Sequence, residues 1–297
     1  MSIEKNINKY TDNNIILPST ESYSVILGIN PSQGARSPKL WNSAYSNFNI
    51  SSQMIPVDVS EDNFLDLMGI LENDSNFSGG AIAAPHKETA AEYIGQNLTK
   101  EAKSIGAINC LFRDEHGKLC GTNTDGEGSL KAFEEEFGKI DDNIILILGI
   151  GGTGKAVSAY FSSAANDINQ IYVSSRSDSA LKLADEIGCN YVKWSSISEF
   201  LPKVDILINC TSLGSTIQPG LSPIIDSDFN KIKKDAIVYD VIYDPNPTPF
   251  LKQANLHGKR TLNGSLMNFE QAVIGFHYAA SNAMQDLNVI DIRQAMK

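Results

Sequence analysis

Two residues of this 297-residue chain, Lys87 and Asp125, have types and surroundings suited to proton transfer. Lys87 follows a short apolar run in the segment APHKET, at the kind of strand end where parallel sheets place ligand-binding residues. Asp125 lies near the end of the polar segment GTNTDG. Reduction of a ketone by hydride needs a proton donor for the developing alkoxide, and a lysine oriented by an aspartate could supply it. Residue type alone favours a solvated surface charge at each position.

A glycine-rich segment, GIGGTG at 149–154, suits the binding of a dinucleotide. It follows the apolar run 144–148 and precedes the helix-forming stretch KAVSAYFSSAA, so it occupies the strand-to-helix turn that this motif requires. The first glycine permits a tight turn, the second lets backbone N–H groups approach a pyrophosphate, and the third lets helix and strand pack closely. A glycine-rich turn without a ligand is the alternative. The residues expected to bind the cofactor are Gly149, Gly151, Gly152, Thr153 and Gly154.

The end of the next predicted strand indicates which dinucleotide binds. An enzyme that uses NAD usually has Asp or Glu there to hold the ribose 2′-OH, whereas this chain has Ser175, Arg176 and Ser177. The guanidinium of Arg176 can pair with a 2′-phosphate through several donors. We therefore predict NADP as the cofactor, held in part by these three residues. The alternative is a solvated arginine at the start of the next helix.

Composition narrows the class of partner. The chain has 24 Lys and Arg against 35 Asp and Glu, which gives a net charge of −11. An acidic surface repels phosphate backbones and anionic lipid, so we expect neither nucleic acid nor a membrane as partner. Residues 1–22 lack the apolar core of a signal peptide and predict a short, ragged leader on a cytoplasmic protein. The four cysteines have no CxxC spacing and the four histidines are scattered, so we predict no disulfide and no metal site.

Short apolar runs alternate with helical patterns from Tyr23 onward, which predicts an α/β protein with mainly parallel strands. Near Asn123 the pattern changes and a second α/β domain begins. Pro56 indicates that its strand is irregular or lies at a sheet edge. The expected strands are 24–29, 53–59, 79–84, 108–113 and 118–121 in the first domain, and 144–148, 170–174, 190–194, 205–209 and 236–241 in the second.

Helices are expected between these strands. Ser37 is the predicted N-cap of a helix that starts with Pro38. Residues 265–280 form one long predicted helix, which we expect to pack back on the first domain, with the active site in the crevice between the domains. The predicted substrate-binding domain therefore comprises 1–124 and 264–297, and the predicted dinucleotide-binding domain comprises 125–263.

The order of several motifs resembles that of the shikimate dehydrogenase family from about Tyr23 to Met284. The matching segments are NPSQGARSP, APHKET, GAINCL, GTNTDG, GIGGTG, SSRS, NCTSLG, YDVIYDPNPTPFL and NGSLMNFEQA. The resemblance implies an N-terminal α/β substrate domain, a Rossmann-type NADP-binding domain, and C-terminal helices that return to the first domain. It also implies an NADP-dependent oxidoreductase of aromatic amino acid and chorismate biosynthesis that interconverts 3-dehydroshikimate and shikimate, as a monomer or homodimer.

The resemblance further implies roles for individual residues. Lys87 and Asp125 match a catalytic pair in which the lysine is proton donor or base and the aspartate orients it. The implied substrate contacts are Asn109 and Gln271 for the ring hydroxyls and Ser37 and Tyr243 for the carboxylate.

Three alanines depart from the family pattern in the expected substrate pocket. Ala35 stands where the family usually has a first carboxylate-binding serine, Ala81 where it has Asn, and Ala83 where it has Thr. Each lost hydrogen bond costs about 1 kcal/mol, and up to about 3 kcal/mol if a partner is left buried and unpaired. Replacement contacts could come from His86, Arg36 or Gln33, which could equally be residues at the pocket rim.

These departures leave two alternatives to shikimate dehydrogenase activity. The first is a paralogue that acts on quinate, an aminoshikimate or another ring carboxylate. The second is a catalytically silent NADP-binding regulatory protein that keeps the fold. Retention of both Lys87 and Asp125 counts against the second alternative, because a silent site has no need of this pair.

Overall fold

The computed structural model describes residues 2–177, 179–281, 284 and 287–297, and the chain divides into two compact units. Unit 1 comprises the chain up to Thr124 together with Gln271–Lys297, and unit 2 comprises Asp125–Glu270. The predicted return to the first domain lies earlier in the chain, at residue 264. The difference arises because Met267 packs in the core of unit 2, whereas the carbonyl of Ala272 accepts a hydrogen bond within unit 1.

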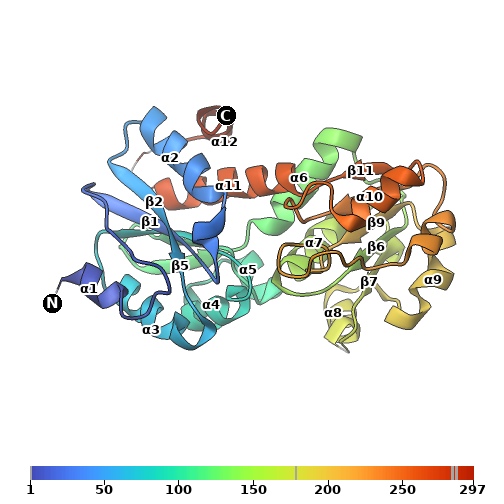
Figure 1. Ribbon diagram of the computed structural model, residues 1–297, viewed down its shortest axis with the longest axis horizontal. Coiled ribbons are helices and arrows are strands. Elements are labelled where there is room, and N and C mark those ends of the chain that lie inside the picture. Colours follow the sequence, from blue (N-terminus) through green and yellow to red (C-terminus); the bar gives the residue numbers. More distant parts are fainter. Residues whose placement is uncertain (1, 178, 282–283, 285–286) are drawn as a thin grey trace. The chain divides into compact units, whose positions relative to one another are not determined.

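Unit 1 is built on a five-stranded sheet with strand order β2-β1-β3-β4-β5, whose strands are coloured blue to green in Figure 1. The first three strands are parallel, and β4 and β5, which correspond to the strands predicted at 108–113 and 118–121, form an antiparallel hairpin. Pro56 lies in β2 at the edge of this sheet, where a residue without an N–H group is tolerated. The strands are β1 Ser22–Gly28, β2 Ser52–Asp58, β3 Phe77–Ile82, β4 Cys110–Arg113 and β5 Leu119–Thr122.

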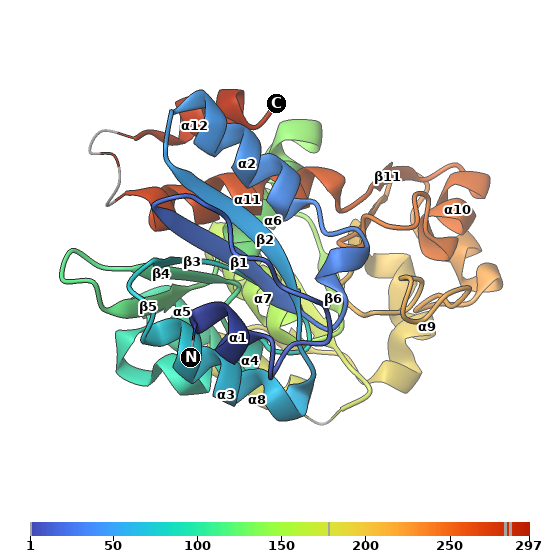
Figure 2. The ribbon, with the colours of Figure 1, turned by 60° about the vertical axis from the view of Figure 1, so that its left-hand side comes forward.

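Helices cover both faces of the unit 1 sheet (Figure 2). On one face, Phe64 of α3 joins a core cluster with residues of β1 and β3. On the other, Trp41 of α2 meets Phe276 of α11 edge to face at 5.4 Å, and its indole N–H donates to Ala272 O at 3.1 Å. The long C-terminal helix therefore packs on the first domain, as expected. The helices are α1 Ile3–Ile7, α2 Ser37–Asn47, α3 Glu61–Glu72, α4 Lys87–Ile94, α5 Lys100–Ile105, α11 Ser265–Ala280 and α12 Val289–Ala295, with 3-10 turns at Pro31–Gln33 and Gly95–Asn97.

The N-terminal segment is part of the folded unit, and the prediction of a ragged leader is wrong. Ile7 and Ile15 are 1% and 3% exposed and belong to the core cluster that contains Phe64. The side chain of Asn8 holds the segment in shape, because it accepts from Ile15 N and donates to Ile15 O, each at 2.8 Å. Ile7 and the short run Ile15-Ile16-Leu17 are separated by polar residues, so the sequence gives no clear periodic signal and only the packing reveals the burial.

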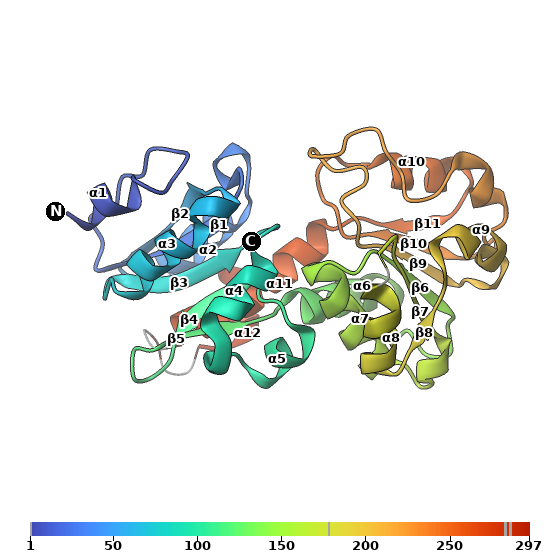
Figure 3. The ribbon, with the colours of Figure 1, turned by 90° about the horizontal axis from the view of Figure 1, so that it is seen from below.

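Unit 2 is a doubly wound α/β unit whose six strands are all parallel, in the order β11-β10-β9-β6-β7-β8 (Figure 3). Each face of its sheet carries an apolar cluster, so the central strands are apolar on both sides, as expected for a buried parallel sheet. The strands are β6 Ile145–Leu148, β7 Ile171–Ser174, β8 Asn190–Tyr191, β9 Ile206–Asn209, β10 Ile237–Asp240 and β11 Arg260–Leu262.

The helices of unit 2 pack against these two clusters. Phe133 of α6 and Phe161 of α7 lie in one cluster, and Phe250 of α10 lies in the other. The helices are α6 Asp125–Phe137, α7 Gly152–Ala164, α8 Ser179–Ile187, α9 Ile197–Phe200 and α10 Pro249–Leu256, with 3-10 turns at Ile168–Gln170, Trp194–Ser196, Leu201–Lys203 and Asp226–Asn230.

Two local predictions are wrong. Ser37 is not the N-cap of α2 but its first residue; the cap position belongs to Arg36, whose side chain makes no capping hydrogen bond. The strand predicted at 190–194 ends at Tyr191, and the chain then turns into the 3-10 segment that starts at Trp194. Both errors lie at element ends, where side-chain type specifies the boundary only weakly.

Within the part of the chain that the structure describes, no helix is long and apolar enough to cross a membrane. The described residues also contain no group of three or more His, Cys, Asp or Glu side chains arranged to hold a metal ion. All four cysteines have free thiols.

The burial of Ile7 predicts that the N-terminal segment stabilises unit 1. We expect Ile7→Ala to lower the free energy of unfolding by about 2–4 kcal/mol, because it leaves a cavity under α1. Urea denaturation measures the loss. Ile16→Ala is the matched control, because Ile16 is 73% exposed, and equal losses in the two variants would contradict the packed segment.

Candidate active site

The carboxyl ends of the three parallel strands of unit 1 bring three loops together. Val59 N donates to Gly28 O and Ala83 N donates to Leu27 O, each at 2.8 Å. The carboxyl ends of β1, β2 and β3 therefore lie next to one another. A Cβ atom added to Gly28 would lie 3.0 Å from the Ala83 Cβ and 3.4 Å from Pro31 Cδ. Loop 29–36 therefore runs directly beside the segment that precedes Lys87.

Lys87 is the first residue of α4, and His86 fixes the start of this helix. His86 is 2% exposed, its Nε2 lies 3.0 Å from Val59 O, and its ring stacks on Phe64 at 4.3 Å. Burial lowers the pKa of His86, so the ring is neutral near pH 7 and donates to Val59 O. His86 is thus a packed residue that anchors the end of β3 to the end of β2, not a residue of the pocket rim.

Asn109 forms a buried hydrogen-bond network with Thr124 and Gln271. The Asn109 Oδ1 accepts from Thr124 N at 2.7 Å, and its Nδ2 donates to Gln271 Oε1 at 3.1 Å. The hydroxyl of Thr124 donates to Gln271 O at 3.0 Å and so ties the return of the chain into unit 1. Ile108 N donates to Lys87 O at 2.9 Å, which places this network next to Lys87. Sequence reasoning missed Thr124, although its motif GTNTDG carried the signal.

In unit 2, the glycine-rich turn lies where the strand order reverses, between β6 and β9. Gly149 has φ +90°, and a Cβ there would lie 2.7 Å from Thr211 Cγ2. A Cβ on Gly154 would collide with Gly149 O, so this glycine lets α7 pack against the end of β6. A Cβ on Gly151 would meet no protein atom within 4 Å. The protein itself therefore requires Gly149 and Gly154, whereas Gly151 leaves open space in front of the backbone, as a dinucleotide pyrophosphate requires.

Asp125 is joined to this turn by a hydrogen bond within unit 2. It is the first residue of α6, 4% exposed, and its Oδ2 accepts from Thr153 Oγ1 at 2.9 Å. Gly152 and Thr153 are the first two residues of α7. The sequence analysis expected Thr153 to contact the cofactor and did not foresee its bond to Asp125.

The predicted 2′-phosphate clamp is a short serine-rich turn after β7. Ser177 N donates to Ser175 Oγ at 3.3 Å, and the hydroxyls of Ser177 and Ser179 lie 2.6 Å apart. Arg176 is exposed beside them. β7 is the parallel neighbour of β6, so this turn and the glycine-rich turn follow adjacent carboxyl ends of the two strands.

A second buried carboxylate, Asp240, holds the segment that carries Tyr243. Asp240 is 0% exposed at the end of β10 and accepts from Thr248 Oγ1 at 2.6 Å, Asn209 Nδ2 at 3.0 Å and Ile242 N at 3.1 Å. Burial raises the pKa of Asp240 to about 7, and these three donors limit the rise. Sequence reasoning missed this residue, because a carboxylate after an apolar strand gives no sign of its burial.

Two family models match the chain. The shikimate dehydrogenase substrate binding domain matches residues 27–111, and the shikimate/quinate 5-dehydrogenase model matches residues 131–219. A shikimate dehydrogenase (NADP(+)) of Methanococcus maripaludis is 35% identical over 245 residues, which are 81% of this chain and 85% of that relative. This chain belongs to the shikimate dehydrogenase family.

Solved structures of shikimate dehydrogenases have the same fold. One of them, a complex with NADP+, is 27% identical, has a TM-score of 0.79, and covers 95% of this chain and 96% of its own. The enzyme of Thermus thermophilus, in complex with NADP(H) and shikimate, is 25% identical with a TM-score of 0.76, and covers 93% of this chain and 98% of its own. The α/β fold class and the family expected from the motifs are confirmed.

The residues that the family resemblance singles out fall into two groups. Within unit 1, the backbone of Lys87 is bonded to that of Ile108, the neighbour of Asn109. Ser37 is 4% exposed at the start of α2. Tyr243 is half-buried in unit 2. Lys87 lies in unit 1 and Asp125 in unit 2, so their pairing stays a prediction. The grouping is Ser37, Lys87, Asn109 and Gln271 in unit 1, and Asp125, Gly149, Gly151, Gly152, Thr153, Gly154, Ser175, Arg176, Ser177 and Tyr243 in unit 2.

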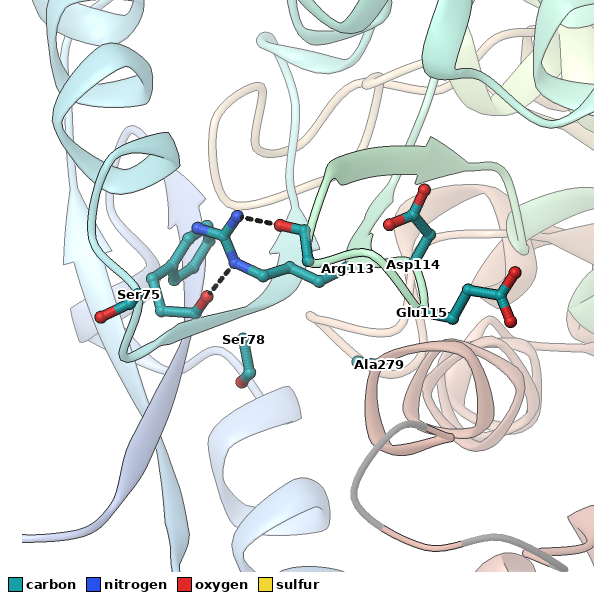
Figure 4. A pocket seen from close by; sticks show the side chains of 8 residues that line it. Ser75, Ser78, Arg113, Asp114, Glu115 and Ala279 are labelled. Carbon is teal, nitrogen blue, oxygen red and sulfur yellow. Dashed lines mark hydrogen bonds between the residues drawn. The ribbon is translucent and has the colours of Figure 1, made fainter.

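A separate pocket of about 430 Å³ lies at the start of β3, at the opposite end of that strand from Lys87 (Figure 4). The guanidinium of Arg113 lines it and donates to Phe77 O and Gly117 O, each at 2.7 Å, and to Glu72 O at 2.8 Å. This arginine ties the hairpin to the end of α3. Arg113, which lines the pocket, therefore serves a structural contact, and the pocket is not part of the candidate site.

The contrast between two glycines yields a prediction for dinucleotide binding. We expect Gly151→Ala to weaken NADPH binding by at least about tenfold while thermal stability changes little, because the added methyl enters the ligand's space. Gly154→Ala should instead destabilise unit 2, because its methyl collides with Gly149 O. Fluorescence titration with NADPH and a thermal melt separate the two effects. Unchanged NADPH affinity in Gly151→Ala would contradict the assignment.

The raised pKa of Asp240 predicts a pH-dependent stability. An unfolded Asp titrates near pH 3.9, so the folded state binds this proton more tightly; the resulting stabilisation is fully present below about pH 4 and is lost as the pH rises to 7. The stability of the wild type relative to Asp240→Asn should therefore fall by up to about 4 kcal/mol between pH 4 and 7.

Urea unfolding at a series of pH values measures this difference. Asp235→Asn is the control, because it makes the same substitution at an exposed position of the same unit. A difference between wild type and Asp240→Asn that is independent of pH would contradict the raised pKa.

Proposed function

We propose that this protein is an NADP-dependent dehydrogenase that interconverts 3-dehydroshikimate and shikimate. The observation that carries the proposal is the backbone bond from Ile108 N to Lys87 O, which joins the start of α4, with its candidate proton donor, to the residue before the buried Asn109. Reduction of a hydroxylated ring ketone needs a proton donor and a hydroxyl-binding group at one place. The relatives named shikimate dehydrogenase (NADP(+)) support both the substrate and the cofactor.

The proposed substrate contacts divide by chemistry. Asn109 and Gln271 bind ring hydroxyls, because amides offer both donors and acceptors. Ser37 and Tyr243 donate hydroxyl hydrogen bonds to the substrate carboxylate. The network through Thr124 supports this assignment, since it holds the Asn109 amide in one orientation and so lowers the entropy lost on binding.

The proposed cofactor contacts are the glycine-rich turn and the serine-rich turn of unit 2. The open space at Gly151 and the N-terminal N–H groups of α7 fit the pyrophosphate of NADP. The guanidinium of Arg176, with the hydroxyls of Ser175 and Ser177, fits the 2′-phosphate. When bound, NADPH supplies the hydride that reduces the ring ketone.

Lys87 and Asp125 are proposed to manage the proton. The Lys87 ammonium donates a proton to the ring oxygen as the ketone becomes an alcohol, and in the reverse direction the neutral amine removes it. Asp125, held by Thr153, orients the ammonium. The reaction balances as ketone, NADPH and a proton giving alcohol and NADP+.

The three alanines favour a second candidate substrate. Ala35, Ala81 and Ala83 remove polar groups from one side of the expected pocket, so a ring acid with another hydroxyl pattern becomes the alternative. Quinate, an aminoshikimate or another ring carboxylate would then replace shikimate, with the same proton and hydride chemistry.

Reduction of NADP by the purified protein tests the proposal, with shikimate and quinate as parallel substrates and NAD as the control cofactor. We expect shikimate-dependent turnover that Lys87→Ala lowers by about 10²- to 10⁴-fold in kcat, since a proton donor contributes that much. Lys103→Ala, at an exposed lysine of α5, is the matched control and should leave kcat unchanged. Tight NADPH binding without turnover of either acid would refute the proposed substrates.

The same assay tests the assignment of NADP as the cofactor, through the KM values for NADP and NAD. Arg176→Ala should raise the KM for NADP much more than the KM for NAD, because only NADP carries the 2′-phosphate. Lys182→Ala, an exposed cation on α8, controls for general loss of positive charge. Equal effects of Arg176→Ala on the KM values of both cofactors would contradict the proposed contact between Arg176 and the 2′-phosphate.

A further inference from the structure

Loop 29–36 connects β1 to the candidate substrate residue Ser37, and its own hydrogen bonds are local. Gln33 N donates to Asn30 O at 3.1 Å and Ala35 N donates to Pro31 O at 3.0 Å. These bonds shape a short 3-10 turn at Pro31–Gln33. They do not attach the turn to the sheet, so the attachment must come from contacts outside the loop.

Asp58 provides such an attachment. It is the last residue of the edge strand β2 and is 6% exposed. Its Oδ1 accepts from Ser32 N at 2.8 Å, and its Oδ2 accepts a second, short hydrogen bond from Ser32 Oγ. Two bonds from one residue to a charged carboxylate are strong and directional, so they fix both the position and the orientation of the turn.

The N-terminal segment in turn holds Asp58. The side chain of Asn13 accepts from Asp58 N at 2.8 Å and donates to Pro56 O at 3.1 Å, and Asp12 N donates to Asp58 O at 2.8 Å. These bonds satisfy backbone groups that the open edge of β2 would otherwise present to water. The end of the strand is therefore clamped on its outer side, and the Asp58 carboxylate is left to face loop 29–36.

We propose that Asp58 is a positioning residue for loop 29–36, and that Asn13 keeps Asp58 in place. This inference rests on the proposed function only in that Ser37, at the end of the loop, holds the substrate carboxylate. An anchored loop presents Ser37 in its binding position before the substrate arrives. A released loop must be ordered on binding, which weakens substrate binding while the proton-transfer group at Lys87 stays intact.

Steady-state kinetics with the ring acid tests the role in binding. We expect Asp58→Ala to raise the KM for shikimate about tenfold, with kcat within about twofold of the wild type and an unchanged Kd for NADPH. Ser32→Ala, which removes one of the two bonds from a half-buried loop residue, should raise KM by a smaller factor. Asn13→Ala should also raise KM by less than Asp58→Ala, and no change in KM in Asn13→Ala would remove Asn13 from the proposal.

Conservative replacement separates positioning from general stability. In Asp58→Asn, the amide oxygen can accept from Ser32 N while the amide nitrogen donates to Ser32 Oγ, so we expect KM close to that of the wild type. Tyr23→Phe is the control, because it removes a 2.7 Å hydrogen bond to the Asp74 carboxylate near the opposite end of the same sheet. An equal rise of KM in Tyr23→Phe and Asp58→Ala would overturn the proposal.

Hydrogen exchange of the peptide that spans residues 29–36 gives a readout that does not depend on turnover. We expect faster exchange of this peptide in Asp58→Ala and wild-type rates in Tyr23→Phe. If shikimate is not turned over by the wild type but the peptide still exchanges faster in Asp58→Ala, the proposed substrate fails and the anchoring of the loop stands. Unchanged exchange in Asp58→Ala refutes the anchoring, whatever the substrate.

Discussion

Neighbouring parallel strands end at the same side of their sheet, and four of the candidate functional segments of this protein depend on that constraint. Loop 29–36, the segment before Lys87, the glycine-rich turn and the serine-rich turn all follow the carboxyl ends of parallel strands. Because neighbouring parallel strands end together, side chains far apart in the sequence come close without any long-range pairing of their own. Within each unit the sheet is therefore the positioning device, and the loops carry the chemistry.

Buried carboxylates hold two of these loops, and the segment after β10, in place. Asp58 accepts from Ser32, Asp125 from Thr153, and Asp240 from Thr248 and Asn209. Each of these hydrogen bonds comes from a hydroxyl, amide or backbone N–H donor. Such donors are directional, so the bonds set the geometry of the segments that carry them.

Glycine serves two different purposes in the dinucleotide turn. Gly149 adopts a positive φ and Gly154 lies against the backbone of the turn, so both are demanded by the fold of unit 2. Gly151 meets no such demand, because a Cβ there would meet no protein atom within 4 Å. The turn therefore contains two glycines that the fold requires and one whose place in the motif we attribute to the proposed dinucleotide.

The fold class, the family and most strands could be predicted from the sequence, because short apolar runs, glycine at a strand-to-helix turn and motif order are local signals. It also indicated Lys87, Asn109 and Asp125 as candidates. The packing of the N-terminal segment, the burial of His86 against Phe64 and the hydrogen bond from Thr124 to Asn109 are visible in the folded structure and not in the sequence. Burial and hydrogen-bond partners depend on which distant segments meet, and residue type at one position does not record that.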